Sequence, residues 1–243
     1  MRSLTFAART AKEILRDPLN LAFGLGFPIV LMLLLSALQA NIEVDLFGLS
    51  HLTPGVAVFG LSFMTLFSSM IVAKDRESAL LQRLYTTPLT ASGFIIGYIL
   101  PLIPIGMAQG VITYILGMIL GLEISINLLW AIIFLIPVTL FHTSVGLLCG
   151  SVMNSKQVGG FCGALLTNIS GWLAGVWFDL DILGEGFKSV AELLPFCHAV
   201  EMEEAVFNGN FEGVFPHLWW VLGYAAAAFI AAVLLFLRQM RKN

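Results

Sequence analysis

The sequence predicts an all-α membrane protein with six transmembrane helices. Its 243 residues are 58% hydrophobic and only 11% charged, and the mean hydropathy is +0.93. Soluble domains do not carry such a composition. The apolar residues also form long uninterrupted runs, which are too uniform for the strands of a barrel. A chain in hydrocarbon must satisfy its own backbone hydrogen bonds, so each crossing is expected to be helical.

Six runs reach the ~20 residues that a helix needs to cross a bilayer. The expected spans are 19–39, 53–73, 94–120, 127–150, 157–178 and 216–237. The third and fourth contain Pro101, Pro104 and Pro137. Because proline interrupts the helical hydrogen bonds, we expect kinks or tilts there and no extra crossings. The chain reads as a single transmembrane domain over 1–243.

Charge is distributed unequally between the two sides of the predicted bundle. Cations precede the first span, follow the second, separate the fourth from the fifth and follow the last; they are Arg2, Arg9, Lys12, Arg16, Lys74, Arg76, Arg83, Lys156, Arg238, Arg241 and Lys242. The loop 179–215 is acidic. By the positive-inside rule, both termini are expected in the cytoplasm and 179–215 outside.

Residues 2–16 are predicted to form an amphipathic helix in the membrane interface. At 100° per residue most apolar side chains share one face and the charged ones share another, with Phe6 as the exception. Asp17-Pro18 breaks the helix before the first span. The helix is either a plain anchor or also touches a cytoplasmic partner.

The segment after the second span mixes charges with apolar residues. Lys74-Asp75-Arg76-Glu77 is followed by Leu80, Leu81 and Leu84 at helical spacing. Thr87 can cap a new helix that has Pro88 at its first position. Residues 77–89 therefore predict a short cytoplasmic helix whose apolar side chains another protein covers.

The acidic loop 179–215 contains enough apolar residues for short helices that are partly embedded in the outer leaflet. Cys197-His198 is a weak metal candidate without further ligands in the sequence, and we expect no metal site. No catalytic residue is predicted. The phosphate-binding pattern G-x-x-x-x-G-K-[ST] is missing from the sequence, so we expect no nucleotide or other cofactor to bind this chain.

Several motifs occur in one order: the amphipathic start, Pro54-Gly55, the Lys-Asp-Arg-Glu segment that ends in Thr-Thr-Pro-Leu, and Leu194-Pro195 followed by Phe207-Asn208-Gly209. In this order they resemble the ABC-2 type transporter permeases, drug-exporter-like members in particular. The resemblance covers nearly the whole chain.

That resemblance implies the transmembrane subunit of an ABC exporter in a bacterial plasma (inner) membrane. Two permeases, identical or paralogous, would pair with two copies of a separate ABC ATPase subunit, which binds ATP and Mg. Alternating access would move a hydrophobic or amphipathic cargo outward. The cargo is a small molecule, a lipid or a peptide, and no nucleic acid is expected.

The resemblance also assigns residues to roles. Those expected to meet or orient the ATPase are Arg76, Glu77, Arg83, Leu84, Tyr85, Thr87 and Pro88. Those expected along the substrate path, on the second and fifth spans, are Phe59, Phe63, Phe67, Leu165, Asn168 and Trp172. Leu194 and Pro195 would form an outer gate. Alternatively, the phenylalanine stripe faces lipid or another helix, and Arg76 and Glu77 pair with headgroups or with each other.

Two rival functions are less compatible with this pattern. Asn168-Ile169-Ser170-Gly171 resembles the rhomboid Gly-x-Ser-Gly, and His142 is a histidine in a span, so an intramembrane serine protease is one alternative. A stand-alone channel is the other, but it would not need the segment 77–89.

Overall fold

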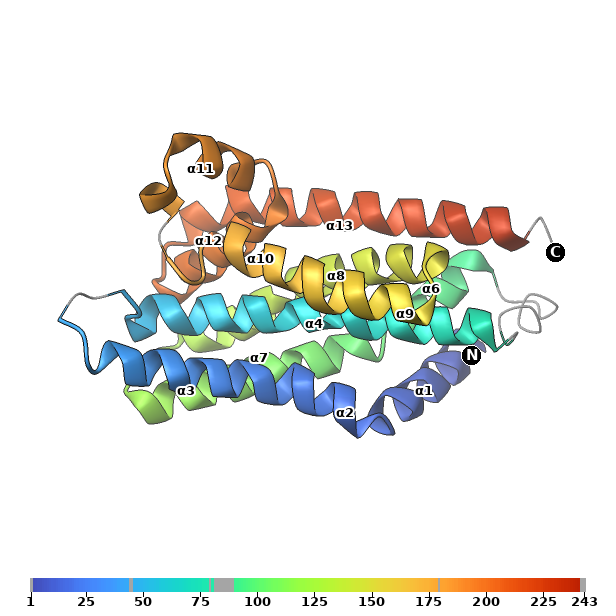
Figure 1. Ribbon diagram of the computed structural model, residues 1–243, viewed down its shortest axis with the longest axis horizontal. Helices are drawn as coiled ribbons and strands as arrows, with labels where there is room; N and C mark the ends of the chain where they lie inside the picture. Colours follow the sequence, from blue (N-terminus) through green and yellow to red (C-terminus); the bar gives the residue numbers. More distant parts are fainter. Residues whose placement is uncertain (1, 44–45, 79, 81–89, 179, 241–243) are drawn as a thin grey trace.

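The computed structural model describes residues 2–43, 46–78, 80, 90–178 and 180–240. Over these residues the secondary structure is helical, with turns and no strand, which confirms the predicted all-α class. The long helices run beside one another as a bundle (Figure 1). Among the described residues, five helices are long and apolar enough to cross a membrane: Ala22–Gln39, Leu49–Glu77, Ser92–Leu120, Asn127–Val152 and Phe211–Arg238.

The first of these spans, Ala22–Gln39, follows α1 (Arg2–Leu15) and the short α2 (Pro18–Leu21), and it is built from two successive helical segments. They are the π-helix η1 (Ala22–Gly26) and α3 (Phe27–Gln39). The second span is α4 (Leu49–Glu77). The predicted first and second spans are therefore both found as helices.

The third and fourth spans contain the three prolines. α6 (Ala91–Ile99) and α7 (Leu102–Leu120) meet at a turn at Leu100 and Pro101. Pro137 lies inside α8 (Asn127–Val152), which continues through it. Since Ser92–Leu120 counts as one candidate span, Pro101 interrupts a helix without adding a crossing.

The predicted fifth span, 157–178, is helical as far as Leu173 and less apolar than the others. α9 (Ser155–Val158), the π-helix η2 (Gly159–Leu166) and α10 (Thr167–Leu173) follow one another with helical dihedrals at the junctions, φ −57° and ψ −47° at Val158. At 1.5 Å per residue this segment is about 28 Å long. It carries Lys156, Gln157 and Asn168, which lower its hydropathy, and it is not among the five candidate spans. Six crossings stay a prediction.

Helix α4 lies at the centre of the bundle. In its most apolar window 89% of residues are buried, against 17% for the first span and 22% for the last. α4 packs against α8, α7, α3 and the α9–α10 segment. Its neighbours cover it on several sides, so α4 forms the core of the bundle, whereas α13 packs mainly against α8 and α12.

Glycines on α8 allow α8 to approach α4 closely. A Cβ atom on Gly150 would lie 2.5 Å from the carbonyl oxygen of Ser69, and one on Gly146 would overlap Ser68 and the Thr65 backbone. Such small-residue contacts are how helices pack in a bilayer, where apolar side chains gain little by leaving lipid.

Helix α1 packs through a face that overlaps only partly with the one that its apolar pattern predicts. Phe6, Ala7, Thr10 and Ile14 are buried, and Leu4 and Leu15 are 61% and 65% exposed. Phe6, the exception in the amphipathic pattern, faces the protein. The exposed leucines leave a second apolar face available for lipid.

The two ends of the bundle differ. α1 and the last residues of α4 and α13 (Phe211–Met240) lie at one end, and α11 (Glu185–Glu192) and α12 (Pro195–Phe207) lie at the other (Figure 1). α12 follows the 3-10 helix η3 (Leu180–Leu183) and α11, and it is mostly buried. Its Glu203 is fully buried and accepts a hydrogen bond from the hydroxyl of Tyr114 on α7 at 2.8 Å. Burial raises the pKa of the Glu203 carboxyl well above its ordinary value, so the neutral acid is favoured.

The close approach of α8 to α4 predicts the effect of a larger side chain. We expect Gly146→Leu to push the two helices apart and destabilise the fold by about 1–3 kcal/mol or more. Gly223→Leu on α13, where a Cβ meets no atom within 4 Å, is the matched control and should stay within about 0.5 kcal/mol. Thermal unfolding of both variants in one detergent measures the difference, and equal midpoints would contradict the packing.

Candidate functional site at the end of the central helix

Four consecutive charged residues form the last turn of α4: Lys74, Asp75, Arg76 and Glu77. The helix thus continues past residue 73, where the predicted span ends. Successive side chains on a helix point about 100° apart. The four charges therefore face different neighbours, and each finds a different partner.

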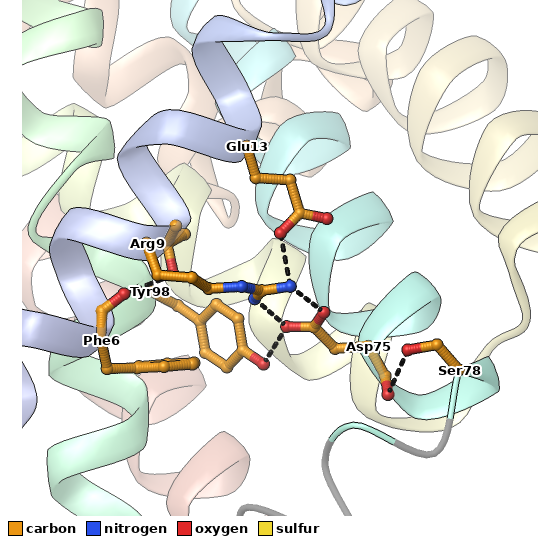
Figure 2. Close-up of polar contacts among 7 residues, drawn as sticks. Phe6, Arg9, Glu13, Asp75, Ser78 and Tyr98 are labelled. Atoms are coloured by element: carbon orange, nitrogen blue, oxygen red, sulfur yellow. Dashed lines mark hydrogen bonds and ion pairs between the residues drawn. The ribbon is translucent and has the colours of Figure 1, made fainter.

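Asp75 is the most buried of the four, with its side chain 2% exposed. Its carboxylate accepts hydrogen bonds from both terminal nitrogens of Arg9 on α1, at 2.6 and 2.7 Å. It also accepts one from the hydroxyl of Tyr98 on α6, at 2.7 Å. Figure 2 shows the side chains of Arg9 and Tyr98 converging on the Asp75 carboxylate. This bidentate pair with a third donor satisfies a buried charge that would otherwise be very unfavourable.

Aromatic contacts hold this site in place. Tyr98 is fully buried, and the Phe6 ring packs edge-on against it at 4.9 Å between centroids and against Phe94 at 5.6 Å. Arg9 also pairs with Glu13 one turn along α1, at 2.6 Å. Burial and the nearby Asp75 charge raise the pKa of Glu13 above its ordinary value.

Arg76 and Glu77 bind the turn between α8 and α9. Arg76 donates to the carbonyl oxygens of Gly150 at 2.7 Å and Met153 at 3.2 Å. The Glu77 carboxylate accepts from the backbone N–H and the hydroxyl of Ser155, both at 2.8 Å. The last carbonyls and first N–H groups of helices have no partner within the helix. Here Arg76 supplies donors to the end of one helix and Glu77 an acceptor to the start of the next.

Lys74 makes the weakest of the four contacts. Its ammonium lies 3.4 Å from Asp17, in the turn after α1, and both side chains are largely accessible. Exposed ion pairs of this kind contribute little. Together the four residues connect the end of α4 to α1, α6, α8 and α9. A displacement applied just beyond Glu77 would act on all of them at once.

The structure describes only part of the predicted ATPase-coupling set. Arg76 is half-buried and Glu77 is exposed at the end of α4, so residue 77 belongs to this helix and does not begin a separate one. The other predicted coupling residues lie outside the described residues; they are Arg83, Leu84, Tyr85, Thr87 and Pro88. Arg76 and Glu77 bind the α8–α9 turn, and their contact with an ATPase stays a prediction.

Sequence reasoning missed the residues at the centre of the site, Arg9, Asp75 and Tyr98. One signal was available: a tyrosine in an apolar span needs a partner for its hydroxyl when it is buried. That partner could not be chosen from the sequence, because Asp75 lies 23 positions away on another helix.

The predicted substrate-path residues do not converge on one cavity. Phe59, Phe63 and Phe67 are buried within the chain. The ring of Phe59 packs against Trp177 at 5.0 Å, and Phe63 packs against Phe27 of α3 at 5.7 Å. Within the single chain the stripe therefore contacts other parts of the bundle, and its place along the substrate path stays a prediction.

The α9–α10 residues of the same predicted set face the other way. Leu165 and Trp172 are 51% and 52% exposed, and Asn168 is exposed with its amide donating to the Ala164 carbonyl at 2.7 Å. Phe59 lies against Gly171 on the buried side of α10, one helical turn from Asn168. The phenylalanines thus lie inside the chain, whereas Leu165, Asn168 and Trp172 lie on its surface.

Two further predictions can be located. Leu194 precedes α12 as its N-cap and Pro195 is the buried first residue of that helix, so the predicted outer gate is the start of a packed helix. Ser170 donates to the Thr167 carbonyl and His142 interacts with Thr65. Their side chains thus have separate partners, an arrangement that offers no support for a serine–histidine dyad.

Because these contacts are buried to different extents, we expect their removal to destabilise the protein by different amounts. Asp75→Asn removes the buried bidentate counter-charge of Arg9, which keeps only its partly exposed pair with Glu13, and should destabilise the protein by about 2–4 kcal/mol. Tyr98→Phe removes one hydrogen bond and should cost about 1 kcal/mol. Lys74→Ala should stay within about 0.5 kcal/mol. Unfolding midpoints of the purified variants test this order, and a Lys74→Ala effect as large as that of Asp75→Asn would contradict it.

Comparison with known proteins agrees with this architecture. The family model described as "ABC-2 type transporter" matches residues 3–207, which include α1, the four charged residues of α4 and α12. A search of curated proteins finds no match. Members of this family are membrane subunits that work with an ABC ATPase subunit. The chain belongs to the ABC-2 type transporter family and is a multi-pass permease subunit of an ABC transporter.

Proposed function

We propose that this permease moves a hydrophobic or amphipathic cargo out of the cell, in an assembly of two permeases and two ATPase subunits. The observation that carries the proposal is the last turn of α4, where four successive charges connect to α1, α6, α8 and α9. A helix end connected in this way suits the receipt of force from a partner. The ATPase partner binds ATP and Mg.

Charge supports a cytoplasmic position for this end. Lys12, Lys74, Lys156 and Arg238 lie on the helices or turns that meet there. Acidic side chains occupy the helices at the other end; they include Glu185, Glu192, Glu201 and Glu212. By the positive-inside rule the α1 end faces the cytoplasm, with six crossings and both termini inside.

The transmission of force follows from the contacts of the site. The segment 78–89 continues directly from Glu77, and we propose that the ATPase binds it through Arg83, Leu84, Tyr85, Thr87 and Pro88. Movement of this segment displaces the end of α4. The Asp75–Arg9 pair then moves α1, and Arg76 and Glu77 move the α8–α9 turn.

The cargo path is proposed on the exposed side of α9–α10. Leu165, Asn168 and Trp172 present an apolar face with one amide. Polar side chains in a span usually face a partner or a cavity. A second permease facing this surface would enclose the path, and Phe59 would support α10 from behind through Gly171. Leu194 and Pro195, where α12 starts, would form the outer limit of the path.

Charge reversal at Glu77 tests the coupling. Glu77→Lys loses the two hydrogen bonds from Ser155 and places a cation at the start of α9, where the helix dipole disfavours it. Because both contacts to the start of α9 are lost, we expect transport to fall several-fold. ATP hydrolysis by the complex should continue. Vesicle transport and phosphate release, measured on one preparation, separate the two activities.

Glu212→Lys is the matched control for this reversal, since Glu212 lies in the first turn of α13 at the other end of the bundle. It should leave the ratio of transport to hydrolysis unchanged. Coupled transport at the wild-type level in Glu77→Lys would reject the proposed role of the α4 end.

The exposed amide of α10 gives a separate test of the path. We expect Asn168→Ala to change the relative transport of neutral and cationic cargo several-fold while basal ATP hydrolysis is retained. Ile133→Ala on α8, also exposed in the single chain, is the control for a surface that faces lipid. Competition between two fluorescent cargoes measures the preference, and identical preferences in the two variants would place the path elsewhere.

A further inference from the structure

Three side chains with metal-binding atoms meet between α12 and α13, at the end of the bundle opposite α1. His198 and Glu201 lie one turn apart on α12, and His217 lies near the start of α13. His198 Nδ1 and His217 Nδ1 are 3.0 Å apart. Glu201 Oε2 is 3.1 Å from His217 Nδ1 and 3.5 Å from His198 Nδ1. One atom from each residue thus forms a small triangle.

The size of this triangle matches one bound ion. With bonds of about 2.0–2.1 Å and a tetrahedral angle, two ligand atoms of a zinc ion are roughly 3.4 Å apart. The three observed separations lie close to this value. Two histidines and one glutamate also make up a known type of three-ligand zinc site, in which water or another ligand takes the fourth position.

A hydrogen bond fixes the tautomer in which His198 can act as a metal ligand. Its Nε2 lies 2.9 Å from the Glu192 carbonyl oxygen, and a carbonyl only accepts, so Nε2 carries the proton. The neutral ring then directs the lone pair of Nδ1 into the triangle. A backbone carbonyl on the far nitrogen is the arrangement that fixes the tautomer of metal-bound histidines. Trp220 stacks on this ring, 4.9 Å away and 20° from parallel.

Without an ion the same atoms are poorly matched. The Nδ1 atom of His198 and the Glu201 carboxylate are both acceptors, and both lie at the one Nδ1 of His217.

Cys197 is a neighbour of the triangle and not a member of it. Ligand atoms of Cys197, His198 and Glu201 all lie within 4.8 Å of one another. However, the Cys197 thiol is close to the Ala191 carbonyl at 3.1 Å, to which it can donate. A thiol that donates this hydrogen bond keeps its proton, which a zinc ligand must lose.

We propose that His198, Glu201 and His217 form a zinc site that fastens α12 to α13. Two imidazoles and one carboxylate suit zinc, whereas calcium and magnesium prefer oxygen ligands. The ion has a route in, because the side chains of Glu201 and His217 are 43% and 28% exposed. The site is independent of the proposed transport function and would stabilise the outer end of the bundle.

The test uses the full chain in detergent, without a polyhistidine tag. Co²⁺ serves as the spectroscopic probe and Zn²⁺ as the competitor. We expect one Co²⁺ per chain, with the intense visible absorption of low-coordinate cobalt, and its displacement by one equivalent of Zn²⁺. His217→Gln should weaken binding by more than about tenfold.

His51→Gln is the matched control, because His51 pairs with Glu204 of α12 outside the triangle. It should bind Co²⁺ as the wild type does. If His217→Gln fails to fold, Glu201→Gln, whose side chain is partly exposed, tests the same triangle. A second readout is the unfolding midpoint, which Zn²⁺ should raise in the wild type and in His51→Gln only. Wild-type protein that takes up no stoichiometric Zn²⁺, or equal weakening in His51→Gln, would overturn the proposal.

Discussion

The pairing of Asp75 with Arg9 is the contact on which the arrangement of this end of the molecule depends. A carboxylate with 2% of its side chain exposed is stable only when it is fully paired. Arg9 and Tyr98 complete that pairing from two other helices. The position of α1 against α4 and α6 is therefore set by a charge as well as by packing. The exposed leucines of α1 remain available for lipid, so this one short helix can contact both the protein and the membrane.

Close packing along α4 allows these contacts to transmit a displacement from one helix to another. Gly146 and Gly150 bring α8 against α4, and Arg76 binds the last carbonyls of α8. Helices that touch backbone to backbone and are joined at their ends move together, because tightly packed interiors transmit strain. At the opposite end α12 is held by Glu203 and Tyr114. The bundle is thus connected at both ends, by charged groups near α1 and by a buried acid near α12.

Much of the fold could be predicted because its signals are local. Apolar length predicted five helices that the structure contains as candidate spans, and the proline positions predicted the interruption at Pro101. The segment 157–178 shows where such reasoning is weakest: Lys156, Gln157 and Asn168 reduce its hydropathy although its backbone is helical. The residues of the candidate site were harder to predict from the sequence. Arg76 and Glu77 were chosen by resemblance, whereas Asp75, the buried member of the same tetrapeptide, was not.

The sequence by itself determined the helical class, the long apolar helices, the separation of basic from acidic ends and the family to which the chain belongs. These follow from composition and from neighbours within a few residues. Only the tertiary structure decided that Phe59 and Phe63 pack inward while Asn168 faces outward, that Arg9 meets Asp75, and that His217 joins His198 and Glu201. Each of these outcomes depends on how two helices are rotated against each other. Helix rotation is set by the packing of whole surfaces, and no local pattern encodes it.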